Sequence, residues 1–218
     1  MGRPQAIIFD FNGTLSQDEP ILCDIFMELF AEHGRPLSAQ EYFDELAGLS
    51  DPEIVRTWLG RDHPDVDEVI AERTRRYRAA VADGSSVPPE LREAVRFAAA
   101  RVPLAIVSGA ARSEIESVVE AAGLANAFAF IVAADDIECG KPNPAGYLRA
   151  LSLFDEDIDA GAVLVLEDTE AGIAAAKAAG MRCIAVLGTL APTRLARADE
   201  IVERIDVRLL ERLLGERD

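Results

Sequence analysis

Four short polar clusters in the sequence carry side chains of complementary chemistry. The clusters are Asp10 with Asn12, Ser108 with Gly109, Lys141, and Glu167 with Asp168. Three carboxylates brought together repel one another unless a cation lies between them, and hard oxygen ligands suit Mg²⁺. A serine hydroxyl, a lysine ammonium and backbone N–H groups beside a glycine suit phosphoryl oxygens. These residue types, if they meet, predict a site in which the Asp10 carboxylate attacks phosphorus.

The clusters meet only if the segments before them form neighbouring strands of one parallel sheet. Ala6–Phe9 is wholly apolar, which is typical of a strand buried on both faces. Further strands are predicted at Leu104–Val107, Phe128–Ala133, Ala162–Leu166 and Cys183–Leu187. Helices are predicted between them at Glu90–Ala100, Ser113–Ala122, Ala145–Leu151 and Glu170–Ala179. This alternation predicts an α/β fold with a doubly wound parallel sheet, whose strands all end at one edge.

The segment after the first strand differs in character. From residue 16 to residue 81, apolar residues recur at helical spacing and no stretch reads as a buried strand, and residues 83–89 read as a linker. We therefore expect two domains, an α/β core formed by residues 1–15 and 86–218 and an inserted all-helical domain formed by residues 16–85. In the insertion, we expect a cluster of arginines to form a solvated helix face. The cluster comprises Arg73, Arg75, Arg76 and Arg78.

Composition narrows the class of protein. Of the 218 residues, 50% are hydrophobic and 28% are charged, as in globular proteins. The net charge of -17 argues against a nucleic-acid partner, because nothing would offset repulsion by phosphates. No apolar run is long enough for a membrane span and no secretory signal precedes the first strand, so we expect a cytoplasmic protein without a membrane partner. The three cysteines, Cys23, Cys139 and Cys183, are expected to be free thiols.

The four clusters, in this order, resemble the motifs of the haloacid dehalogenase superfamily. The resemblance is to the branch with a helical cap after the first motif, which includes phosphoglycolate phosphatases and β-phosphoglucomutase. The matching stretches are Asp10-Phe11-Asn12-Gly13-Thr14-Leu15, Val107-Ser108-Gly109, Gly140-Lys141-Pro142 and Leu166-Glu167-Asp168-Thr169-Glu170-Ala171-Gly172. The resemblance implies a Rossmann-like core, a helical cap domain, and Mg²⁺-dependent phosphoryl transfer through an aspartyl-phosphate.

The resemblance also implies roles around the metal ion. Asp10 would be the nucleophile and a Mg²⁺ ligand, and Asn12 would offer its backbone carbonyl to the metal. Asp168 would bind the metal directly, whereas Glu167 would bind it either directly or through water.

Other positions would bind the substrate. Ser108, Gly109 and Lys141 would hold the phosphoryl oxygens, and Lys141 would also neutralise Asp10. Gly48 and Ser50 lie in a stretch that resembles the loop with which such caps approach the substrate, so both are expected to face the active site.

Asn12 departs from the family pattern. Family phosphatases carry a second Asp there, which protonates the leaving oxygen and then activates water. An amide has no proton that titrates near neutral pH, and loss of such a group costs roughly 10²–10⁴-fold in rate. Four explanations stay open: slow turnover aided by a good leaving group or an acid of the substrate, an acid/base residue from the cap, an engineered inactive form, or deamidation of Asn12 to Asp.

Taken together, these features predict a Mg²⁺-dependent phosphatase that acts on a small phosphorylated metabolite. One alternative is a phosphoryl mutase of the β-phosphoglucomutase type, which relies on the same missing acid/base. The other alternative is a protein that binds phosphorylated ligands with impaired catalysis, an option that Asn12 keeps open.

Overall fold

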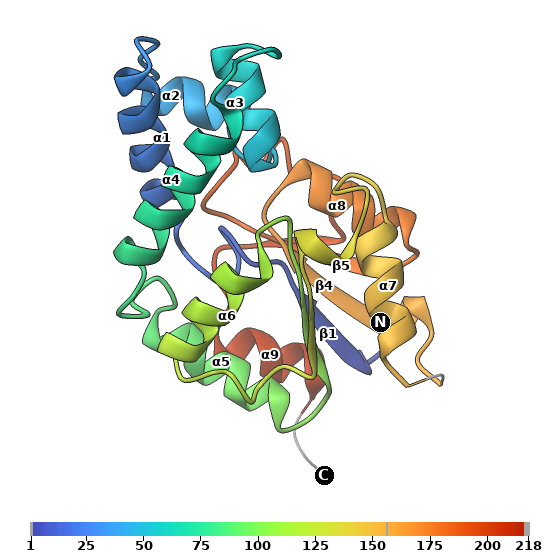
Figure 1. The fold of residues 1–218 in the computed structure, drawn as a ribbon. Coiled ribbons are helices and arrows are strands. Elements are labelled where there is room, and N and C mark those ends of the chain that lie inside the picture. The colour runs from blue at the N-terminus through green and yellow to red at the C-terminus, as the bar shows by residue number, and fades with distance from the viewer. Residues whose placement is uncertain (1, 156, 216–218) are drawn as a thin grey trace.

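The computed structural model describes residues 2–155 and 157–215. Its centre is a sheet with the strand order β3-β2-β1-β4-β5-β6, in which every pairing is parallel (Figure 1). The strands are β1 Ala6–Phe9, β2 Leu104–Val107, β3 Phe130–Val132, β4 Val163–Glu167, β5 Arg182–Val186 and β6 Glu200–Val202. The predicted doubly wound α/β fold is confirmed, with β1 at the middle of the sheet.

Helices cover both faces of the sheet because its strands are apolar on both sides. On β1, Ile7 and Phe9 belong to the apolar layer beneath α5 (Pro89–Ala99), α6 (Arg112–Ala121) and α9 (Val207–Leu214). Ala6 and Ile8 belong to the opposite layer, beneath α7 (Ala145–Leu153) and α8 (Glu170–Ala178). Two short 3-10 turns complete this part of the chain, η2 at Ala134–Asp136 and η3 at Ala160–Ala162.

The remaining helices form a group of their own, drawn in blue to teal in Figure 1 and here called the cap. They are α1 Glu19–Glu32, α2 Ala39–Glu41 with the π-helical turn η1 Tyr42–Leu46, α3 Asp51–Leu59 and α4 Val66–Ala80. Ser38 caps the start of α2, since its hydroxyl accepts a hydrogen bond from the Glu41 amide at 3.3 Å. The domain boundaries at residues 16 and 85 stay our proposal. Across residues 2–155 and 157–215, no helix combines the length and apolar character needed to cross a membrane.

One buried ion pair joins the cap to the core. Nη1 of Arg73 on α4 lies 2.5 Å from Oε1 of Glu114 on α6, and each residue is only 2% exposed. The expectation of a solvated face is therefore wrong for Arg73. It holds for Arg75, whose side chain is 70% exposed beside Glu72. Helical geometry explains the difference, because Arg73 lies one turn from the buried Tyr77, whereas Arg75 projects from another face.

Candidate active site

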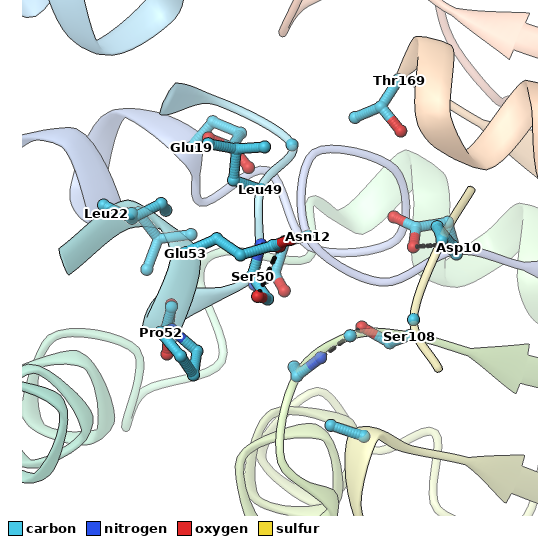
Figure 2. Close-up of a pocket in the computed structure, with 18 of the residues that line it drawn as sticks. Asp10, Asn12, Glu19, Leu22, Leu49, Ser50, Pro52, Glu53, Ser108 and Thr169 are labelled. Carbon is cyan, nitrogen blue, oxygen red and sulfur yellow. Dashed lines mark hydrogen bonds and ion pairs between the residues drawn. The ribbon is translucent and has the colours of Figure 1, made fainter. Parts of the chain in front are cut away.

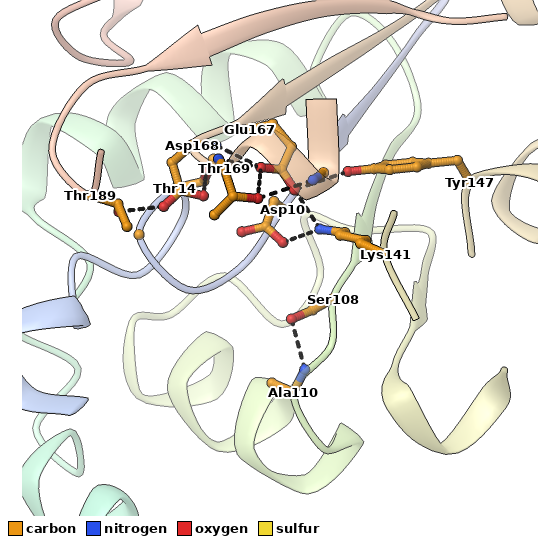
Figure 3. A network of polar contacts seen from close by, with 12 residues as sticks. Asp10, Thr14, Ser108, Ala110, Lys141, Tyr147, Glu167, Asp168, Thr169 and Thr189 are labelled. Atoms are coloured by element: carbon orange, nitrogen blue, oxygen red, sulfur yellow. Dashed lines mark hydrogen bonds and ion pairs between the residues drawn. The ribbon is translucent and has the colours of Figure 1, made fainter. Parts of the chain in front are cut away.

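Three neighbouring strands end at the site. In the sheet register, Phe9 of β1 pairs with Ile106 of β2 on one side and with Leu166 of β4 on the other. The Asp10 amide continues this pairing with a 2.9 Å hydrogen bond to the Leu166 carbonyl. The residues at the ends of these strands are consequently brought together, namely Glu167 as the last residue of β4, and Asp10, Ser108 and Asp168 just after β1, β2 and β4 (Figure 3).

Three acidic groups and one ammonium form the centre of the site. Asp10, Glu167 and Asp168 are buried, and each offers a carboxylate oxygen within 4.8 Å of the others. The Lys141 ammonium donates to Asp10 and, at 2.6 Å, to Glu167 Oε1. Burial disfavours the charge on Lys141, but Asp10 and Glu167 outweigh it and raise the Lys141 pKa well above its usual value. The cluster thus holds more carboxylates than its single ammonium neutralises.

Asp168 is the least compensated of these acids. Its oxygens accept hydrogen bonds from Thr14 Oγ1 at 3.1 Å and from the Thr189 hydroxyl, and it is fully buried. Burial, followed by the nearby Glu167 and Asp10 charges, raises the Asp168 pKa well above its ordinary value. A divalent cation with a preference for oxygen ligands would relieve this repulsion, so the residues present fit such an ion.

Glu167 is held differently, because both of its oxygens are occupied. Oε2 accepts from the Asp168 amide at 2.8 Å, the Thr169 amide at 2.8 Å and Thr169 Oγ1 at 2.9 Å. Oε1 accepts from Lys141 and from the Tyr147 hydroxyl at 3.4 Å. This arrangement favours contact with a cation through water rather than directly. Gly172 permits it, because a Cβ atom there would lie 1.6 Å from Oε1.

Ser108 is the first residue after β2 and begins the loop that leads to α6. Its Oγ accepts a 3.0 Å hydrogen bond from the Ala110 amide, which leaves its own proton free to donate. Ser108 and Gly109 both line the pocket, and Gly109 is exposed. A hydroxyl donor beside an open glycine backbone suits an oxyanion.

The Asn12 amide has a fixed orientation. Its Nδ2 donates to Asp18 Oδ2 at 3.0 Å, and the same carboxylate accepts from the Tyr77 hydroxyl and from the Gly13 amide at 3.3 Å. One N–H of the amide is used by Asp18, and no proton of the amide titrates near neutral pH, so Asn12 can hydrogen-bond a group in the pocket but cannot act as an acid or base.

The pocket between the cap and the sheet edge has a volume of about 480 Å³ (Figure 2). Gly48 and Ser50 line it from the cap, as expected. Gly48 has a φ of +89° and packs close to α8, since a Cβ there would lie 3.1 Å from Thr169 Cγ2. Ser50 donates to Glu53 Oε2 through its amide at 3.0 Å and its hydroxyl at 2.6 Å, which caps α3.

The structure adds residues that the sequence analysis did not assign to the site. Glu19, Tyr42 and Arg73 line the pocket from the cap, and all three are buried. Glu19 lies next to Pro20 and reads in the sequence as part of a polar helix start. The sequence does indicate its burial, because Glu19 precedes Leu22, Cys23 and Phe26, which recur at helical spacing and are buried.

Comparison with known proteins identifies similar chains. Residues 7–186 match the family described as haloacid dehalogenase-like hydrolase. The chain is 30% identical over 215 residues to validoxylamine A 7'-phosphate phosphatase of Streptomyces hygroscopicus subsp. limoneus, covering 91% of this chain and 93% of that protein. It is also 30% identical over 208 residues to protein CbbY of Rhodobacter capsulatus, covering 90% and 88%.

Solved structures agree with these similarities. A mutant of CbbY from Rhodobacter sphaeroides in complex with xylulose-(1,5)bisphosphate has a TM-score of 0.80 and 28% identity, over 93% of this chain and 95% of that chain. β-Phosphoglucomutase from Clostridium difficile has a TM-score of 0.79 at 18% identity, over 94% and 93%, which indicates a shared fold.

Proposed function

The chain belongs to the haloacid dehalogenase-like hydrolase family, and we propose that it is a phosphatase acting on a small phosphorylated metabolite. The observation that carries this proposal is the convergence of Asp10, Lys141, Glu167 and Asp168 at one edge of the sheet, beside a pocket of about 480 Å³. Relatives named as phosphatases support the reaction class.

A magnesium ion fits the chemistry of these donors. Asp10 and Asp168 would hold it directly together with the backbone carbonyl of Asn12, and Glu167 would reach it through water. The ligands would all be oxygen atoms, which is the preference of Mg²⁺. When bound, the ion would offset the negative charge of the phosphoryl oxygens and bring them close to the Asp10 carboxylate.

In the proposed reaction, an oxygen of Asp10 attacks phosphorus and the alcohol leaves. The resulting aspartyl-phosphate is then opened by water, which releases phosphate and restores Asp10. The Ser108 hydroxyl, the Gly109 amide and the Lys141 ammonium would donate to the phosphoryl oxygens and stabilise the charge of the transition state. Gly48 and Ser50 would contact the remainder of the substrate.

Phosphate release from several esters tests this proposal. The panel comprises p-nitrophenyl phosphate, 2-phosphoglycolate and sugar phosphates, each with Mg²⁺ or with EDTA. We expect Mg²⁺-dependent release that falls roughly 10³-fold or more in Asp10→Ala. The matched control Asp62→Ala changes an exposed carboxylate outside the pocket and should behave as wild type. Intact mass before the assay verifies that residue 12 is still Asn.

Two other results would favour the alternatives. Transfer of phosphate between positions of a sugar without release would indicate a mutase. Mg²⁺-dependent binding of phosphate esters, with turnover no faster than that of Asp10→Ala, would indicate a ligand-binding protein; the amide at Asn12 is the observation that keeps this candidate in view.

A further inference from the structure

Hydrolysis of an alkyl phosphate requires a proton for the leaving oxygen, and Asn12 has none to give. Four carboxyl groups line the pocket besides Asp10 and Glu167, namely Glu19, Asp51, Glu53 and Glu138. Asp51 lies 3.3 Å from Arg73 Nε, and Glu53 accepts two hydrogen bonds from Ser50. Glu138 is exposed to water. Asp51 is therefore paired with a guanidinium, Glu53 is held at the start of α3 and Glu138 lies in water, whereas Glu19 is buried in the pocket wall.

Glu19 is the first residue of α1 and only 8% of it is exposed. Its hydrogen-bond partner is the Tyr42 hydroxyl, which lies 3.1 Å from Oε2. Figure 2 shows Glu19 near Leu22 and Leu49 of the cap, on the other side of the pocket from Asp10. A carboxyl group on that side faces the nucleophile across the pocket, where the leaving oxygen of an in-line displacement must depart.

We propose that Glu19 is the general acid and base of this chain, in place of a carboxylate at position 12. The inference rests on the proposed phosphatase function, since it assigns the proton donor of that reaction.

The adjacent residue Asp18 is not placed for this role. Asp18 is fully buried, does not line the pocket, and accepts hydrogen bonds from Asn12, Gly13 and Tyr77. Burial raises the Asp18 pKa as it raises that of Glu19, so the two residues differ in their access to the pocket rather than in the direction of the pKa change.

Burial and the surrounding charges also affect the protonation of Glu19. Burial is the largest cause, followed by the Asp18 charge and more weakly by Asp10, and together they raise the Glu19 pKa to about 7. The Tyr42 hydrogen bond from η1 and the Arg73 charge from α4 act in the opposite direction. Near neutral pH Glu19 therefore populates both forms, as a residue that donates and later accepts a proton requires.

In both proposed steps one proton is transferred through Glu19. As the bond from Asp10 to phosphorus forms and the bond to the leaving oxygen breaks, the Glu19 proton moves to that oxygen and an alcohol departs. In the second step, the Glu19 carboxylate takes a proton from water while the water oxygen attacks phosphorus. The bond to Asp10 then breaks, which yields phosphate and restores both side chains.

Two esters with different leaving groups test the assignment. We expect Glu19→Gln to lower kcat/KM for 2-phosphoglycolate roughly 10²–10⁴-fold. The loss should be less than about tenfold for p-nitrophenyl phosphate, because p-nitrophenolate leaves without protonation. The matched control is Glu68→Gln, which changes an exposed glutamate of the cap outside the pocket, so both rates should stay within about twofold of wild type.

A pH profile provides a second readout. Tyr42→Phe removes the hydrogen bond that lowers the Glu19 pKa, so the alkaline decline of kcat/KM for 2-phosphoglycolate should move to higher pH. Equal losses in Glu19→Gln for both esters, or no loss for either, would overturn the assignment. So would a gain of about 10²-fold for 2-phosphoglycolate in Asn12→Asp, which would mean that position 12 had lacked the acid. If wild type releases no phosphate from any ester of the panel, sugar phosphates included, the proposed function fails first, and Glu19 loses its role with it.

Discussion

We expect the buried ion pair between Arg73 and Glu114 to stabilise the protein by joining the cap to the core. The pair is 2.5 Å apart and almost fully buried, and Asp51 lies 3.3 Å from Arg73 Nε. Arg73→Met would leave the carboxylates of Asp51 and Glu114 without their cation, away from bulk water. Removal of one partner of a buried ion pair costs about 3–5 kcal/mol. With an m-value of about 2.5 kcal/mol per molar, the midpoint of urea unfolding should fall by about 1–2 M.

The control lies in the same helix. Arg75→Met changes a side chain that is 70% exposed and pairs with Glu72, so the urea midpoint should be unchanged. The double variant Arg73→Met/Glu114→Leu removes both charges, and we expect it to be more stable than Arg73→Met alone. The difference from additivity should be about 1–3 kcal/mol.

Two results would show that the ion pair does not stabilise the folded protein. If Arg73→Met and Arg75→Met had equal midpoints, the burial of Arg73 would have no energetic consequence. If the two single changes in the double variant were additive, Arg73 and Glu114 would not interact in solution.

Three further predictions concern the site. Gly172→Ala would place a methyl carbon 1.6 Å from Glu167 Oε1, so kcat/KM for phosphate release should fall roughly 10²-fold; Gly161→Ala, which has open space around it, should have wild-type kinetics. Thr189→Val removes a hydroxyl that donates to Asp168 and should weaken Mg²⁺ binding roughly 10–100-fold in calorimetric titration; an unchanged affinity would argue against Asp168 as a ligand. In metal-free protein, the Glu19 pKa rises from 4.5 to about 7 on folding, so the folded state binds the proton more tightly. This group alone should lower the free energy of unfolding by about 3 kcal/mol as pH rises from 4.5 to 7, so the decline between pH 5 and pH 8 in urea titrations should be smaller by about that amount in Glu19→Gln than in wild type.

The elements of the fold could be predicted because their signals are local. An apolar run such as Ala6–Phe9 is typical of a strand buried on both faces. Thr169 and Gly180 mark the ends of α8 through a capping hydrogen bond and a positive φ. The residues at which a strand begins and ends are harder to predict from the sequence. The segment expected at Phe128–Ala133 forms a strand only at Phe130–Val132, because its length is set by its pairing with β2.

The polar groups at the strand ends were also readable from the sequence. Parallel strands place their carboxyl ends on one edge, so Asp10, Ser108 and Glu167 had to meet once the sheet was predicted. The sequence likewise shows that position 12 is an amide, which excludes one acid/base without any structure.

Only the tertiary structure decides which groups surround the Asn12 amide. The Asn12 nitrogen is turned toward Asp18, which Tyr77 of α4 also contacts from 59 positions along the chain. Glu19 meets Tyr42 across 23 positions, and Arg73 meets Glu114 across 41. Whether a charged side chain lies in water or in a buried pocket depends on such distant contacts. Helical periodicity fixes only the face from which the side chain projects, and packing between the cap and the sheet edge decides what that face meets.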